Sequence, residues 1–105
     1  MIEPLLKDIE PLVVSELSRA NLVNPQFHSS HEGYAVLREE YQETSEELEL
    51  MKHHLFGLWM SVRQNRPDSA KDHVECLKDK AMNVAAEAIQ VAAMCDKYMN
   101  MKECD

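Results

Sequence analysis

Acidic side chains are concentrated in one short stretch of this sequence. Residues 38–49, REEYQETSEELE, hold six glutamates in twelve positions. Within that stretch Glu40 and Glu43 stand three residues apart, so on a helix both carboxylates project to the same side. Glu87 and Gln90 repeat this spacing farther along the chain. Carboxylate and amide oxygens are the hard ligands that Mg²⁺ or Mn²⁺ prefers. The pattern therefore indicates either a metal site or an ordinary solvated acidic face, and Glu46 and Glu49 fit the second.

Two long helices must position these four residues. A Ser29-x-x-Glu32 capping box predicts the start of the first helix. One proline and several polar residues predict a break over 63–72, with the turn at Pro67 and Asp68. The second helix then continues to about Tyr98, and the two are expected to form an antiparallel hairpin. Their predicted contact seams step by three and four, and comprise Tyr34, Leu37, Tyr41, Thr44, Leu48, Met51, Leu55, Leu58 and Val62 on the first and Val74, Leu77, Ala81, Val84, Ala88, Val91, Cys95 and Tyr98 on the second.

Heptad numbering of these seams places the candidate ligands on one flank. With Tyr34 as an a position, Glu40 falls at g and Glu43 at c, and the same numbering of the second helix places Glu87 at g and Gln90 at c. Because g edges face each other in an antiparallel pair, a hairpin centred near residue 67 brings the four side chains to one height beside the core. Carboxylates collected there repel unless a cation or a proton compensates them.

The segment before the hairpin is also predicted to be helical. Residues 2–20 carry apolar side chains at helical spacing, and Pro4 suits a first turn. Pro11 does not suit a helix interior, so we expect a kink or two short helices there. The predicted fold class is therefore all-α, a long antiparallel helical hairpin with a short kinked N-terminal helical segment. The expected parts of the single domain are the N-terminal segment and connector (1–27), the motif-bearing hairpin (28–100) and a tail (101–105).

Composition excludes several classes of function. The net charge of −8 over 105 residues disfavours binding to nucleic acid or to anionic lipid, and no apolar run approaches the roughly 20 residues of a membrane helix. The chain has only two glycines and no glycine-rich phosphate loop. Its three cysteines lack CxxC spacing, which is typical of reduced thiols in a cytoplasmic protein. The five histidines show neither HExxH nor an i, i+4 pair, which argues against a zinc site.

Two segments, HEGYAVLREEYQE at 31–43 and EAIQVAAM at 87–94, resemble the MazG-like all-α nucleoside triphosphate pyrophosphohydrolases, and most closely the small members of bacteria and their phages. The family pattern is E-x-x-E on one helix and E-x-x-D on the next. Glu40-x-x-Glu43 fits the first half, and Glu87-x-x-Gln90 fits the second except that a neutral amide replaces the aspartate. The resemblance covers roughly residues 28–100, and both helices are longer than in typical members.

The resemblance implies a reaction and a set of roles. The reaction is hydrolysis of a nucleoside triphosphate to a monophosphate and pyrophosphate, in which Mg²⁺ or Mn²⁺ is bound. The resemblance assigns Glu40, Glu43, Glu87 and Gln90 to the metal and Glu39 or Glu47 to the attacking water. The alternative is a non-catalytic helical interaction module, of a kind that a phage could encode, in which the glutamates serve solubility and pairing. Gln90 keeps this alternative open, because a neutral amide weakens metal binding.

Association of two chains is expected, and the alternative is a monomer whose N-terminal segment folds over the exposed apolar stripe. The helices carry more apolar surface than one hairpin and a short segment can cover, and members of the resembling family work as dimers or pairs of dimers. We therefore expect a homodimer in which two hairpins form a four-helix core, with the acidic cluster open at its side. The residues expected to carry the excess are Tyr34, Trp59, Met60 and the stretch 89–93.

Overall fold

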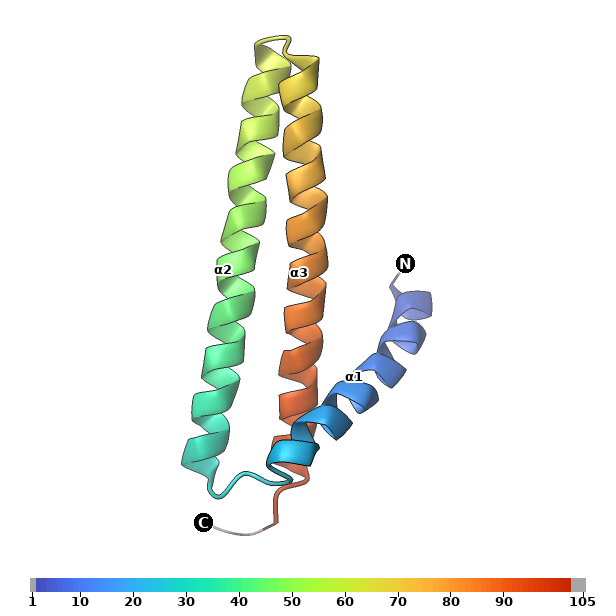
Figure 1. Ribbon diagram of the computed structural model, residues 1–105, viewed down its shortest axis with the longest axis vertical. Coiled ribbons are helices and arrows are strands. Elements are labelled where there is room, and N and C mark those ends of the chain that lie inside the picture. The colour runs from blue at the N-terminus through green and yellow to red at the C-terminus, as the bar shows by residue number, and fades with distance from the viewer. Residues whose placement is uncertain (1, 103–105) are drawn as a thin grey trace. The chain divides into compact units, whose positions relative to one another are not determined.

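The computed structural model describes residues 2–102 and is all-α, as predicted. Helices α2 and α3 pack as an antiparallel pair joined by a short turn, which confirms the hairpin (Figure 1). Residues 103–105, which make up most of the predicted tail, lie outside the described residues. No helix among those described has the length and apolar character needed to cross a membrane. The three helices are α1 (Glu3–Val23), α2 (Ser30–Arg63) and α3 (Pro67–Met99).

The chain forms two compact units, and the boundary between them cuts both long helices. The first unit combines residues 2–41 with residues 87–102, and therefore contains α1, the start of α2 and the end of α3. The second unit, residues 42–86, contains the hairpin turn with the adjoining parts of α2 and α3. Each unit has its own contacts between the two long helices.

The core of the first unit is small. Phe27, Ala93 and Met94 are its buried apolar residues, with 4%, 0% and 8% of their surfaces exposed. Phe27 comes from the connector between α1 and α2, so this connector covers the core. Ala93 was expected among the excess apolar residues, and that expectation is wrong because Ala93 is fully covered. The side chains packed around this centre are Val13, Leu17, Ala20, Val36, Leu37, Tyr98 and Met101.

The predicted capping box is present at the start of α2, with one difference. The backbone N–H of Glu32 donates to Ser29 Oγ at 3.1 Å, as expected. The Glu32 carboxylate reaches one residue farther back than in the standard box, where Oε1 accepts the backbone N–H of His28 at 3.0 Å. This backbone bond and a side-chain bond from the His28 ring lower the pKa of Glu32 below its ordinary value.

Helix α1 corrects the expectation of a break at Pro11. Pro4 lies in the first turn as predicted, but Pro11 lies inside one continuous helix of 21 residues. Proline at position 11 removes the N–H that would bond the carbonyl of Lys7. Both Lys7 and Pro11 are exposed, so water can hydrate that carbonyl. One lost hydrogen bond on the solvent side therefore does not divide the helix in two.

The turn of the second unit lies before Pro67 rather than at it. Asn65 has a φ of 53°, and the N–H of Arg66 donates to the carbonyl of Ser61 at 2.9 Å while the N–H of Asn65 donates to that of Val62 at 3.1 Å. These two bonds around a left-handed residue form a Schellman motif. Pro67 is the first residue of α3, a position where its missing N–H costs nothing.

The two long helices contact each other along only part of the predicted seam. Tyr34 and Tyr41 of the first unit are 64% and 65% exposed, and Leu48 and Leu55 of the second are 53% and 56% exposed. All four are a positions, whereas the d positions of α2, such as Met51, are partly buried. The g positions of α2 take the place of the a positions in the contact with α3. Apolar periodicity identified the residues of the stripe but not which edge of it faces the partner helix.

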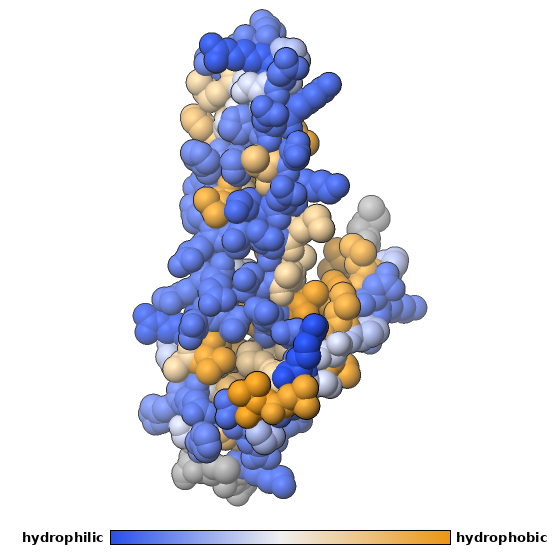
Figure 2. All heavy atoms as spheres, in the orientation of Figure 1, coloured by the Kyte–Doolittle hydropathy of each residue, from blue (hydrophilic) through white to orange (hydrophobic). Residues whose placement is uncertain are grey.

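Many apolar side chains are consequently exposed. Figure 2 shows apolar side chains gathered over α1, where Leu12 and Val14 are 52% and 62% exposed. In the second unit the exposed apolar positions include Trp59 and Val62 at 57% and 52%, while Met60 is only partly exposed.

Candidate functional site

Three of the predicted ligands meet within the first unit. Glu40 belongs to α2, whereas Glu87 and Gln90 belong to α3. With its side-chain amide turned so that nitrogen faces the carboxylates, Gln90 donates to Glu40 Oε2 and to Glu87 Oε2, both at 3.1 Å. The shared flank that heptad numbering predicted for these residues is therefore observed. An aspartate at position 90 has no N–H, so it could not make either bond.

Glu43 is the fourth predicted ligand and follows Glu40 by one turn of α2. Glu43 belongs to the second unit, whereas Glu40 and Glu87 belong to the first. All three residues are partly buried. Carboxylate oxygens are the donors that Mg²⁺ or Mn²⁺ prefers.

The two residues predicted to orient water have different surroundings. Glu39 is exposed on α2. Glu47 is partly buried in the second unit, where its Oε2 accepts the side-chain N–H of Asn83 at 3.4 Å and lies 3.8 Å from the ammonium of Lys80. Glu47 is thus engaged by α3, and of the two residues Glu39 is the more available to a water molecule in solvent.

A pocket of about 280 Å³ in the first unit was not foreseen from the sequence. Lys97 lines it and is buried, with 7% of its surface exposed. Its ammonium donates to the carbonyl of Asn24 and lies 4.8 Å from the centre of the Phe27 ring. A lysine on an apolar helix face gives no sequence signal for such a contact. Lys97 therefore ties the end of α3 to the connector, and the pocket walls also include His28 and Glu32.

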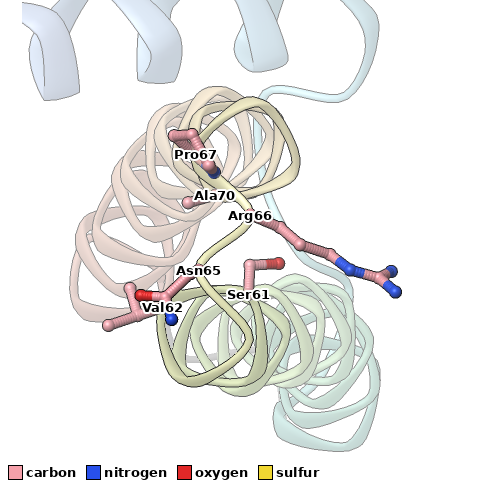
Figure 3. Close-up of a pocket in the computed structure, with 6 residues that line it drawn as sticks. All are labelled: Ser61, Val62, Asn65, Arg66, Pro67 and Ala70. Carbon is pink, nitrogen blue, oxygen red and sulfur yellow. The ribbon is translucent and has the colours of Figure 1, made fainter.

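A larger pocket of about 580 Å³ lies beside the hairpin turn in the second unit (Figure 3). Ser61 and Ser69 join the helices there, with their Oγ atoms 2.8 Å apart. The side chain of Arg66 extends away from the other lining residues (Figure 3). Since no carboxylate lines this pocket, it is not an extension of the acidic cluster. The lining consists of Ser61, Val62, Asn65, Arg66, Pro67 and Ala70.

Two histidines of the second unit also meet, which sequence motifs did not reveal. The Nδ1 atoms of His54 in α2 and His73 in α3 are 3.4 Å apart. These residues are 19 positions apart, so no local spacing could identify them. The signal that could have found them is the heptad numbering, because both histidines occupy g positions on facing helices, as Glu47 and Lys80 do.

Comparisons with protein-family models, with curated proteins and with solved structures find no match for this chain. The chain's motifs and geometry are therefore the basis for any functional assignment.

Proposed function

We propose that this chain binds Mg²⁺ or Mn²⁺ through Glu40, Glu43 and Glu87 and hydrolyses a nucleoside triphosphate to a monophosphate and pyrophosphate, or descends from a protein that did. The observation that supports this proposal is the meeting of Glu40 and Glu87 in the first unit, where Gln90 donates to both carboxylates, on residues of the MazG-like motif. Hard oxygen donors of this kind suit these two ions.

The residues would divide the work as follows. The three glutamates would hold the ion, and Gln90 would join them only if its amide turned to present its oxygen instead of its nitrogen. A bound ion would neutralise the phosphates and lower the pKa of a water ligand. Glu39 would orient the attacking water, since Glu47 is held by Lys80 and Asn83. Water would add to the α-phosphorus, and the bond between that phosphorus and the oxygen bridging to the β-phosphate would break.

A homodimer is part of the same proposal. The a positions of α2 form a column of exposed apolar side chains in each unit, including Tyr34 and Tyr41 in the first and Leu48 and Leu55 in the second. Packing of this column against a second hairpin would build the four-helix core. The carboxylates lie at the g and c edge of the helices, away from the a column, so they would stay open to substrate.

The second candidate function, a non-catalytic helical interaction module, is favoured by Gln90 itself. Its amide donates to two carboxylates that a cation would otherwise bridge. In the absence of an ion, the N–H groups of this neutral amide stabilise the carboxylates of Glu40 and Glu87 by hydrogen bonding. In this case the exposed apolar column would be the functional surface, and the acidic residues would keep the protein in solution.

One experiment separates the two candidates. The purified protein is incubated with each common nucleoside triphosphate and Mg²⁺ or Mn²⁺, and released pyrophosphate is measured. Glu43→Ala should abolish release, whereas Glu46→Ala, which removes an exposed carboxylate from the same helix, should preserve it. Equal release by the protein and by Glu43→Ala would contradict the assignment. If no triphosphate is turned over and neither ion changes the melting temperature, the interaction module is the better description.

A further inference from the structure

The contact between His54 and His73 is a second place in the molecule where metal-binding atoms converge. Both residues lie in the second unit and are partly buried, and their Nδ1 atoms are 3.4 Å apart. Their ring planes are tilted by 49°. Zn²⁺ binds imidazole nitrogen at 2.0–2.1 Å. Two nitrogens 3.4 Å apart, each at that distance from one ion, subtend an angle of about 110° at the ion, which is the tetrahedral value.

The backbone of α2 is shaped to hold one of these rings. A β-carbon at Gly57 would stand 2.4 Å from Cε1 of His73 and 2.7 Å from each of its ring nitrogens. Glycine in a helix interior costs about 1 kcal/mol relative to alanine. At position 57 the missing side chain leaves the space that the His73 imidazole occupies. The ring of His73 is therefore seated against α2 by packing and does not depend on its bond to His54.

We propose that His54 and His73 bind a transition-metal ion of the Zn²⁺ class, which bridges α2 and α3 in the second unit. Neutral imidazole is a preferred ligand of such ions, whereas the carboxylate cluster suits harder ions. The two histidines supply two ligands, and water or a donor from another molecule would complete the shell. The proposal does not depend on the pyrophosphohydrolase activity.

Ion binding requires a change of tautomer at the pair and a rotation of the rings that turns both lone pairs toward the ion. In the metal-free protein one Nδ1 carries the proton and donates to the other. Both Nδ1 lone pairs must face the ion, so the donating ring would carry its proton on Nε2 instead. Two neutral imidazoles thus bind the ion with no proton released.

The test is a titration of the full chain with Zn²⁺, followed by calorimetry and by the melting temperature, with Mg²⁺ as the comparison ion. With excess Mg²⁺ present throughout, so that the acidic cluster of the proposed function is occupied, we expect one Zn²⁺ per chain and a rise in melting temperature beyond that produced by Mg²⁺ alone. His54→Ala and His73→Ala should each abolish both effects. His53→Ala is the matched control, because the His53 ring neighbours that of His54 at 5.5 Å but is not part of the nitrogen pair, and it should bind normally.

Glu43→Ala should also leave Zn²⁺ binding intact, which separates this site from the acidic cluster. Should a histidine variant fail to fold, Gly57→Ala offers a second route, since its β-carbon displaces His73 while both imidazoles remain in the chain. It should weaken Zn²⁺ binding. Binding that persists in His54→Ala and His73→Ala, or no Zn²⁺ binding by the unaltered chain, would overturn the proposal.

Discussion

Gly33 of α2 lies directly against the ring of Tyr98 of α3. A β-carbon at position 33 would stand 2.5 Å from Tyr98 Cδ2 and 3.2 Å from Phe27 Cδ2. Glycine is thus the residue that allows α2, α3 and the connector to close on one another in the first unit. The small core there depends on this approach, because only three apolar residues of the described chain are buried.

Gly33→Ala should therefore destabilise the protein, by about 1–3 kcal/mol. Alanine has the better helix propensity by about 1 kcal/mol, so a purely local effect would have the opposite sign. Chemical denaturation of both proteins measures the difference. In a Tyr98→Ala background most of the cost should vanish, since the nearest clashing ring is gone. A Gly33→Ala protein that is more stable than the parent would show that the ring moves aside freely.

Replacement of Gln90 by aspartate tests its role between the two carboxylates. Gln90→Asp removes both donor bonds and adds a charge, so the metal-free protein should lose about 1–3 kcal/mol of stability. The same change should tighten Mn²⁺ binding, because it supplies a charged ligand. Calorimetric titration and denaturation measure the two effects. Gln42→Asp adds the same charge at an exposed position of α2 and should change neither. Unchanged Mn²⁺ affinity in Gln90→Asp would place residue 90 outside the metal's shell.

The left-handed residue of the hairpin turn makes a prediction about fold stability alone. Asn65 has a φ of 53°, which costs an ordinary L-residue about 1–2 kcal/mol. Asn65→Gly should be neutral or stabilising, and Asn65→Val should destabilise by roughly that amount, as thermal melting would show. Equal melting temperatures for the two variants would contradict the Schellman motif.

Local chemistry and heptad arithmetic predicted much of this architecture. Ser29 and Glu32 identified the start of α2 because a capping box depends on neighbouring residues only. Glu40 and Gln90 could be placed on one flank because both helices are regular over many turns. The exposure of Leu48 and Leu55 could not be predicted, since an apolar stripe wider than one contact does not specify which edge is buried. The contact between His54 and His73 could not be predicted from heptad numbering alone, because the pairing of residues across the hairpin depends on where the turn lies. The turn was predicted at Pro67, whereas it lies before that residue.

The cap of α2 should make stability depend on pH. The pKa of Glu32 is lowered from 4.5 by the backbone N–H of His28 first and by the His28 ring second. A carboxyl group whose pKa is lower in the folded protein than in the unfolded chain stabilises the fold. This stabilisation is fully present above the pKa of the unfolded chain and is lost as the pH falls through the pKa of the folded protein. The loss should therefore occur below about pH 4.5. Melting temperature against pH should fall less steeply in Glu32→Gln, whereas Glu46→Gln, at an exposed position, should follow the parent. If melting temperature depended on pH identically in Glu32→Gln and in the parent, the cap of α2 would not be the cause of that dependence.

The exposed a column predicts how two chains associate. Leu55 belongs to the part of this column in the second unit and is 56% exposed. A lysine at position 55 would place a charge inside the proposed four-helix core. Leu55→Lys should therefore convert the dimer into a monomer. Leu50→Lys is the control, because Leu50 is a c position on the opposite flank of α2 and is 40% exposed. Light scattering after size exclusion should give the unaltered chain and Leu50→Lys about twice the chain mass of 12.1 kDa, and Leu55→Lys a mass near it. A mass near 12.1 kDa for the unaltered chain at micromolar concentration would refute the dimer.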